Sequence, residues 1–299
     1  MTALEVDVIL CSNRQSPFLF ETLESLRRQS FSNWRLILVD DGSPCPEFFD
    51  RLVSNLPGTR VVHQPARGLP AARNTAITVG SAPLIAFLDD DDIWHSEKLQ
   101  SQVLAHIGDP AAVASFTAGH YIDSAGFSFN GGWLGDTAPS REFIRGAAPL
   151  PRIVTLMVTR VAMARVGPFN ESYSVGEDNE FVIRLALSGN LTGVPRDLVS
   201  YRRHDGNMSK DFDVAGRQSS WRLLKEQLHV AKSRGDSASW ELLEENLRTS
   251  RCIWAPYALR NLKRALVGCD FRSAWGELGG VYRCGPKAIL SAILDRWTT

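Results

Sequence analysis

The stretch 84-LIAFLDDDD-92 joins five apolar residues to four consecutive aspartates, and it decides the fold class of the chain. Leu84 to Leu88 is a short apolar run without a helical period, which is typical of a buried strand. Asp89 to Asp92 follow at the point where this strand ends. A strand that is apolar on both faces needs helices above and below it, as in a parallel sheet.

Strands and helices alternate on either side of this stretch. The residue pattern predicts further strands at 6–11, 34–39 and 60–63. It predicts helices from Ser16-Pro17 to Gln29, over 70–79, and from a cap at Ser96 through Leu99, Val103 and Ile107. Ligands of such sheets bind beyond the carboxyl ends of the strands, so the aspartates lie where a ligand is expected.

The rest of the chain predicts less regular structure and then helices alone. Residues 120–150 are rich in glycine and are predicted to form loops. A strand at 153–158, a helix at 159–166, a helix at 177–187 and a strand at 198–203 follow. From about residue 212 we expect helices over 217–234, 238–249, 256–267 and 286–297, with breaks near Gly235, Pro256, Gly268 and Pro286. We therefore expect one domain over 1–211, with halves at 1–110 and 111–211, and a helical region over 212–299.

The composition is that of an ordinary globular protein. Apolar residues make up 44 % of the 299 residues, and 33 basic side chains balance 33 acidic ones. Zero net charge and the absence of a nucleic-acid motif argue against binding to DNA or RNA. Five scattered cysteines without a metal-ligand spacing, an acidic N-terminus and no run of about 18 apolar residues predict a cytoplasmic protein with reduced thiols.

The four aspartates at 89–92 are the strongest chemical signal. Adjacent carboxylates repel one another, and Mg²⁺ or Mn²⁺ would compensate their charge with hard oxygen ligands. The alternative is a solvated acidic loop that caps the next helix. The position directly after a buried strand favours the metal.

Three weaker signals lie elsewhere in the sequence. Asp41, in the segment Asp40-Asp41-Gly42-Ser43, could accept hydrogen bonds from a base or a ribose, or belong to an ordinary turn. Arg73, one turn into a helix that follows Gly68, could bind phosphate or hold an acidic loop in place. Glu177 and Asp178 begin a helix and could cap it or supply a general base, with His204 downstream.

Taken in order, these motifs resemble the inverting family 2 glycosyltransferases of GT-A fold. The resemblance covers about the first 210 residues and rests on five pieces: Val39–Ser43, Gly68 with Ala72–Asn74, Phe87–Trp94, Glu177–Asp178 and Tyr201–His204. It implies an α/β, Rossmann-like domain with a mostly parallel sheet that binds a nucleotide sugar. It also implies a metal-dependent hexosyltransferase that uses Mn²⁺ or Mg²⁺ and most commonly a UDP-sugar, with GDP and dTDP as alternatives.

The resemblance also assigns roles to residues. Asp41 would contact the base, and Arg73 with Gly68 would support the nucleotide pocket, to which the loop at Ser12 and Arg14 also belongs. Asp89 and Asp90 belong to the nucleotide- and metal-binding motif. Asp91, Asp89 and His204 would be placed at the metal, and Arg202 at the donor phosphates. Asp178 would be the catalytic base, with Glu177 beside it.

The acceptor implied by the family is a glycan, a lipid-linked glycan or another hydroxyl compound of surface polysaccharide synthesis. The basic and aromatic residues of 250–299 suit an anionic lipid interface, so the C-terminal helices could rest on the inner face of a membrane. They could instead complete the acceptor site, join two copies of the chain, or pack as an ordinary hairpin. Two other functions remain open: a sugar nucleotidyltransferase and a non-catalytic nucleotide-sugar or glycan-binding protein.

Overall fold

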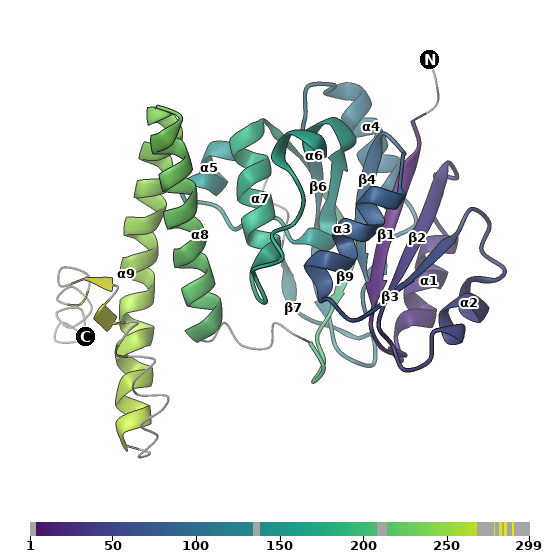
Figure 1. The fold of residues 1–299 in the computed structure, drawn as a ribbon, viewed down its shortest axis with the longest axis horizontal. Coiled ribbons are helices and arrows are strands. Elements are labelled where there is room, and N and C mark those ends of the chain that lie inside the picture. The colour runs from purple at the N-terminus through teal and green to yellow at the C-terminus, as the bar shows by residue number, and fades with distance from the viewer. Residues whose placement is uncertain are drawn as a thin grey trace. The chain divides into compact units, whose positions relative to one another are not determined.

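The computed structural model describes residues 4–133, 138–207 and 214–267, together with six single positions between 278 and 289. The chain divides into two compact units. Unit 1 comprises residues 1–140 and 149–207, and unit 2 comprises residues 141–148 and 208–299. Figure 1 shows the elements of both.

The described residues of unit 1 form a nine-stranded sheet in the order β3-β2-β1-β4-β8-β6-β9-β5, with β7 paired to β6. The first four of these strands are parallel, and so are β6 and β9. The bounds are β1 Val6–Ser12, β2 Trp34–Asp41, β3 Arg60–Gln64, β4 Leu84–Asp89, β5 Ile93–Trp94, β6 Ala114–Ile122, β7 Ser128–Trp133, β8 Leu156–Thr159 and β9 Leu191–Arg202. The mostly parallel sheet predicted from the sequence is confirmed.

Helices cover the sheet and leave its carboxyl edge to loops (Figure 1). They are α1 Leu19–Arg27, α2 Glu47–Val53, α3 Leu69–Val79, α4 Lys98–Gly108, α6 Arg160–Val166 and α7 Glu177–Ser188, with a 3₁₀ turn at Ile153–Thr155. All seven residues of β1 are buried, and the apolar side chains of β1, β2 and β4 pack against Leu19, Leu23 and Leu99. This core fixes where each strand ends, and therefore where the polar loops begin.

Two helix starts differ from the sequence-based prediction. The segment at Ser16-Pro17 forms a turn, and α1 begins at Leu19, because the Ser16 hydroxyl donates to the carbonyl of Asp90. Helix α4 begins at Lys98 without a Ser96 cap, and the side chain of Gln29 accepts the N–H of Leu99 instead. Ile107 is 58 % exposed, so its predicted place on the buried face is wrong.

The predicted loop region at 120–150 was also wrong in part. It contains the end of β6, all of β7 and α5 (Ser140–Ile144), because the glycines of β7 stand in an extended strand. The sequence pattern also missed α2 and the two-residue strand β5. The strand predicted at 198–203 begins seven residues earlier, at Leu191.

The described part of unit 2 is built from α8 (Val214–Ser233) and α9 (Ser237–Val267), which pack against each other. The predicted break near Gly235 is confirmed, but Pro256 lies inside α9 and does not end it. The Asn246 side chain donates to the carbonyl of Ile144 and holds the 141–148 segment. Most of the helix predicted over 286–297 falls outside the described residues. Among the described helices none is both long and apolar enough to cross a membrane.

Candidate functional site

Five segments of unit 1 bring the predicted site residues to the carboxyl edge of the sheet. Strands β1, β2 and β4 lie side by side in parallel, so their ends place Ser12, Asp41 and Asp89 at one edge. The residues that follow β9 reach the acidic loop Asp89–Asp92 through His204, which contacts Asp91. The start of α7 is joined to the same loop through Arg73, which binds both Glu177 and Asp89. The sequence therefore folds so that motifs far apart in the chain become neighbours.

The acidic loop at 89–92 concentrates negative charge in a partly buried place. Asp90 accepts a hydrogen bond of 2.5 Å from the Ser12 hydroxyl, and burial raises its pKa to about 6. Burial also raises the pKa of Asp91, and the charge of Asp89 adds to this. Crowded and partly buried carboxylates of this kind gain from a nearby cation.

Asp91 has two polar neighbours from the segment that follows β9. Its Oδ2 lies 3.0 Å from Nε2 of His204 and 3.2 Å from Nδ2 of Asn207. The His204 ring also packs against Phe18, with a centroid distance of 4.7 Å. One carboxylate and one imidazole therefore face each other at the end of the sheet.

Asp92 is fully buried and is held by the main chain of β9. Its Oδ1 accepts the N–H of Arg202 at 2.8 Å, whereas Oδ2 has no hydrogen-bond partner among the described residues. Burial raises its pKa well above the ordinary value. Asp92 anchors the acidic loop and adds to the surplus of acidic groups there.

These residues fit a divalent cation by the chemistry of their donors. A carboxylate with an imidazole suits Mn²⁺, and the crowded aspartates supply the charge that a cation offsets. No three His, Cys, Asp or Glu side chains of the described residues form a ready-made cage. A site that takes one or two protein ligands and completes its shell with substrate phosphate and water is the usual arrangement for Mg²⁺.

Arg73 connects the acidic loop to the start of α7. Its Nη2 lies 3.0 Å from Asp89 Oδ1 and its Nη1 lies 3.0 Å from Glu177 Oε1. The side chain is only 4 % exposed. Burial alone would lower the pKa of Arg73, but the charges of Asp89 and Glu177 hold it above the ordinary value. Of the two roles weighed for Arg73, the geometry therefore supports the holding of an acidic loop.

The two carboxylates at the start of α7 have different surroundings. Glu177 is buried in the ion pair with Arg73, and burial raises its pKa although the arginine opposes this. Asp178 is half-buried, and its Oδ1 accepts the N–H of Asn179 at 2.8 Å. No ion pair is recorded for Asp178 within the described part of the chain, so its carboxylate is the more available of the two.

Asp41 organises the loop that leads into α3. Its Oδ1 accepts from the Gln64 side chain at 2.7 Å and from the N–H of Arg67 at 2.9 Å. Its Oδ2 accepts the N–H of Gly68 at 2.7 Å. A carboxylate has about four acceptor positions, so these three bonds leave about one of them unused. Gly68 has a φ of +91°, which a residue with a side chain rarely adopts.

Comparison with known proteins places this arrangement in a family. Residues 7–171 match the model of glycosyl transferase family 2, which is more than half of the chain. The chain belongs to glycosyltransferase family 2. The resemblance drawn from the sequence motifs is thereby confirmed.

Curated relatives of this glycosyltransferase agree with that assignment. The chain is 34 % identical to the Escherichia coli β-1,3-glucosyltransferase WfgD over 104 residues, and these cover 33 % of this chain and 39 % of WfgD. It is 25 % identical to WfaP from the same species, over 78 % of this chain and 88 % of WfaP. The chain spans 26 to 39 % of the length of three of the curated relatives it matches.

The structure of S. aureus TarS 1–349 in complex with UDP-GlcNAc is similar in fold. It superposes with a TM-score of 0.69 at 15 % identity, covering 97 % of this chain and 84 % of TarS 1–349. At this identity the likeness concerns the fold alone. The predicted GT-A-type α/β fold is confirmed.

Arg202, predicted at the donor phosphates, and Arg14, predicted in the nucleotide pocket, have different environments. The Arg202 side chain is 1 % exposed, and it donates to Glu21 and to the carbonyls of Asp91, Asp123 and Ser124. This geometry makes Arg202 a support of the acidic loop. Arg14 is exposed. It lies near His204, because both side chains come close to Gly206: a Cβ built on this glycine would be 3.2 Å from Arg14 Nη1 and 3.0 Å from the imidazole of His204.

Sequence reasoning missed several residues that shape the site. Asn207 donates to Asp91, and its Oδ1 accepts the N–H of His204 at 2.6 Å. Gln64 donates to Asp41, and Thr22 donates to the carbonyl of Asp92. The turn Asp205-Gly206-Asn207 after His204 was the one available signal, since Asp-Gly and Asn favour turns.

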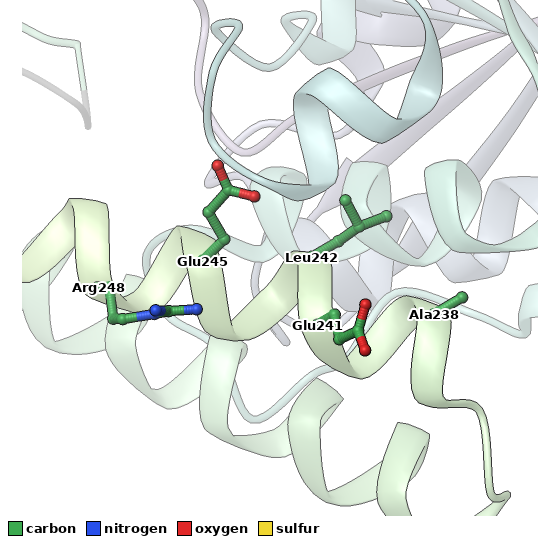
Figure 2. Close-up of a pocket in the computed structure, with 5 residues that line it drawn as sticks. All are labelled: Ala238, Glu241, Leu242, Glu245 and Arg248. Atoms are coloured by element: carbon green, nitrogen blue, oxygen red, sulfur yellow. The ribbon is translucent and has the colours of Figure 1, made fainter.

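A hollow of about 510 Å³ lies on α9, as Figure 2 shows. Its lining residues are Ala238, Glu241, Leu242, Glu245 and Arg248. None of the predicted site residues contributes to it. It is a feature of unit 2 and plays no part in the arrangement at the sheet edge.

Proposed function

We propose that this family 2 glycosyltransferase transfers a sugar from a UDP-sugar to an acceptor hydroxyl and inverts the anomeric configuration. The observation that carries the proposal is the Arg73 bridge, which fixes the start of α7 against the acidic loop. A base at 178 and a charged donor site at 89–91 thereby come to one sheet edge. A single displacement needs this arrangement. A base must take the proton of the acceptor hydroxyl while positive charge offsets the negative charge that develops on the leaving diphosphate.

Donor binding is assigned to the edge formed by β1, β2 and β4. The remaining acceptor position of Asp41 would take a base N–H, and Ser12, Asp89 and Asp90 would line the ribose and phosphate side. Gly68 lets the main chain approach closely. The exposed Arg14 is the cation best placed to contact the diphosphate. UDP is favoured because TarS is described as a complex with UDP-GlcNAc and WfgD as using UDP-Glc.

Asp91 and His204 would hold Mn²⁺ or Mg²⁺, with Asp89 near enough to add its charge. When bound, the cation offsets the negative charge that develops on the departing nucleoside diphosphate. Asn207 and Arg202 keep Asp91 and His204 facing each other through their hydrogen bonds to both segments.

Asp178 is proposed as the general base, and Glu177 as the residue that positions it. A base must carry an available carboxylate oxygen near the acceptor hydroxyl. The Glu177 carboxylate is engaged in the ion pair with Arg73. In Asp178 only Oδ1 has a recorded hydrogen bond, from the N–H of Asn179, so Oδ2 is the oxygen proposed to act as the base. The ion pair of Glu177 would therefore hold Asp178 in place while the acceptor loses its proton.

The acceptor is proposed to be a lipid-linked glycan of polysaccharide synthesis. WfgD and WfaP are described as acting on α-D-GlcNAc-diphosphoundecaprenol, and WcaA is described as a putative colanic acid biosynthesis enzyme. Residues 246–267 contain five cations and no carboxylate. Arg248, Ile253 and Lys263 of this stretch are exposed, so peripheral contact with an anionic membrane is part of the proposal.

Calorimetric titration with UDP, GDP, dTDP and CMP, with and without Mn²⁺, tests the donor assignment. We expect UDP to bind in the presence of Mn²⁺ and to lose this binding in Asp91→Ala. Hydrolysis of the matching UDP-sugars then identifies the sugar. If no nucleotide binds under either condition, a non-catalytic glycan-binding protein becomes the better description.

Flotation with vesicles tests the membrane contact. We expect co-flotation with anionic vesicles at low salt and none with neutral ones. Recovery of all the protein in the unbound fraction at low salt would end this part of the proposal. Light scattering on the same sample measures whether two copies of the chain associate.

A further inference from the structure

Three polar side chains of β6 and β9, none of them assigned to the donor, form a chain of hydrogen bonds. Nδ1 of His120 lies 2.9 Å from both carboxylate oxygens of Asp197. Nε2 of the same ring lies 3.1 Å from the hydroxyl oxygen of Ser200. A carboxylate, an imidazole and a hydroxyl joined in this order have the connectivity of an acyl-transfer triad, in which the imidazole activates the serine.

An irregularity in β9 brings Asp197 and Ser200 to the same imidazole. On a regular strand, residues three apart point to opposite faces of the sheet. Here Ala118 pairs with Asp197 and His120 pairs with Ser200, so two steps along β6 match three steps along β9. The extra residue shifts the alternation of β9, and both side chains reach His120. Bulges re-aim side chains in this way and are over-represented next to active sites.

The carboxylate determines which ring nitrogen of His120 carries the proton. An ionised carboxylate only accepts hydrogen bonds, so Nδ1 is the donor toward Asp197. In the neutral imidazole, Nε2 then has no proton and accepts the hydroxyl of Ser200. This is the tautomer that a general base needs in order to take a proton from a nucleophilic serine.

The arginine beside the cluster has partners of its own. Arg196 pairs with Glu97 at 2.6 Å and donates to the Ser101 hydroxyl at 2.8 Å. Among the ion pairs recorded for the described residues, that of Asp197 is with His120. The side chain of His120 is 28 % exposed and that of Asp197 is 48 % exposed, so a substrate can reach the cluster from solvent.

We propose that Ser200, His120 and Asp197 form a second reaction centre, which hydrolyses carboxylic esters through an acyl-serine. Ser200 and His120 are its catalytic residues, and Asp197 is the residue that positions His120. The exposed position suits a short acyl group carried by a large alcohol. This activity goes beyond glycosyl transfer and does not depend on it.

The reaction has two steps. The Ser200 oxygen attacks the carbonyl carbon, its proton passes to Nε2 of His120, and the bond from that carbon to the alcohol oxygen breaks. The alcohol leaves with the proton from Nε2, and the acyl group stays on Ser200. Water then attacks the acyl carbon with Nε2 as its base, which releases the carboxylic acid and restores the hydroxyl. Asp197 stays ionised and stabilises the protonated imidazole.

Labelling with diisopropyl fluorophosphate, followed by mass mapping of the peptides, tests whether Ser200 is activated. We expect the label on Ser200 in the wild type and none there in Ser200→Ala. His120→Gln should slow the labelling by at least about tenfold, because a general base contributes roughly 10²–10⁴-fold. Ser233→Ala is the matched control, since Ser233 is an exposed serine whose hydroxyl donates to the carbonyl of Val230. It should react like the wild type.

Asp197→Asn tests the positioning role. Its amide can turn the NH₂ group toward Nδ1, which moves the ring proton to Nε2 and leaves no acceptor for the hydroxyl of Ser200. We therefore expect slow labelling of Asp197→Asn and faster labelling of Asp197→Glu, which restores a carboxylate. Labelling of Asp197→Asn at the wild-type rate would overturn the triad.

Hydrolysis of p-nitrophenyl acetate by the full chain measures the complete cycle. We expect turnover in the wild type and a loss of at least about tenfold in Ser200→Ala. His229→Gln controls for direct reaction of the ester with an exposed imidazole and should keep the wild-type rate. A label that maps elsewhere than Ser200 in the wild type, or equal hydrolysis by Ser200→Ala, would overturn the proposal. Melting curves and UDP binding of each variant report the fold and the donor site separately.

Discussion

Arg73 and Glu177 form a buried ion pair, with Nη1 3.0 Å from Oε1, although they are 104 residues apart in the sequence. The same guanidinium binds Asp89 through Nη2. One side chain of α3 therefore sets the distance between the acidic loop and the first turn of α7. This explains why two adjacent carboxylates, Glu177 and Asp178, can have separate roles.

Asp178→Asn should lower turnover by about 10²–10⁴-fold while UDP affinity stays at the wild-type level. The amide keeps the shape of the side chain but cannot accept the acceptor's proton. Steady-state kinetics with a true acceptor and UDP calorimetry measure the two quantities.

Glu177→Gln is the comparison variant for that substitution. It removes the charge opposite Arg73, so we expect a lower melting temperature and a smaller loss of turnover than in Asp178→Asn. The reverse order of activities, with Glu177→Gln inactive and Asp178→Asn active, would transfer the role of base to Glu177.

Asn74→Ala should reduce kcat about tenfold or more with little change in UDP affinity. The Asn74 amide pairs with the main chain of Phe169, donating to its carbonyl at 2.9 Å and accepting its N–H at 2.8 Å. This pairing holds the segment between α6 and α7, which leads to Asp178. Loss of the pairing leaves two main-chain groups of the buried Phe169 without their partner.

Thr78→Ala is the control for Asn74→Ala, because Thr78 lies one turn further along α3 and its hydroxyl bonds only to the carbonyl of Asn74 among the recorded contacts. It should keep kcat. An Asn74→Ala enzyme with wild-type kcat would show that the α6–α7 segment is positioned by other contacts, such as the exposed pair of Arg67 and Glu171.

The sequence predicted well which residues lie at the carboxyl ends of the strands, and it predicted poorly which of these side chains pair with one another. Apolar runs followed by aspartates at Asp41 and Asp89 predicted where two strands of the donor half end, because burial and strand period are local properties. The sequence placed Arg202 at the donor phosphates and allowed Arg73 to bind phosphate, but it could not show their partners Glu21 and Glu177, which lie far away in the chain. No spacing rule contains that information.

The errors in the helical regions have a similar origin. Pro256 was predicted to break a helix, but α9 continues through it, with Pro256 exposed and Ala255 and Ala258 beside it buried. Ile107 was placed on the buried face of α4, whereas the helix buries Lys98, Gln102 and His106 instead. Leu99 and Val103 are buried as predicted, and hydrogen-bonded polar residues such as Lys98 and Gln102 are buried beside them.

Asp7→Ala should destabilise unit 1 by about 3 kcal/mol without changing UDP affinity. Asp7 is fully buried at the start of β1, the end of the strand opposite to Ser12. It binds Arg160 at 2.6 Å, Arg35 at 3.0 Å and the N–H of Ala82 at 2.8 Å. Both arginines are partly exposed and can regain water, which places the cost at the lower end for a broken buried pair.

Urea unfolding of Asp7→Ala beside Asp50→Ala measures this cost. Asp50 is 58 % exposed and contacts only His63 among the recorded ion pairs, so its loss should change stability by less than about 1 kcal/mol. Equal stability of the two variants would show that the buried cluster at Asp7 contributes no more than a surface pair.

Lys98 should make stability increase with pH. The side chain is fully buried, with Nζ 2.6 Å from Gln102 Oε1 and 3.9 Å from the centroid of Trp94, and burial lowers its pKa well below 10.5. Between the lowered pKa and about 10.5, the unfolded chain holds a proton that the folded protein has lost. The unfolded state then binds more protons, so the free energy of unfolding rises with pH in that window.

The difference in unfolding free energy between the wild type and Lys98→Met isolates this effect, because all other titrating groups are shared. We expect the difference to rise by up to about 1.4 kcal/mol per pH unit inside the window and to level off near pH 10.5. Lys232→Met, measured in the same way, is the matched substitution at an exposed lysine. A flat difference for Lys98→Met up to pH 10 would mean that Lys98 stays charged in the folded protein, supported by the Trp94 ring.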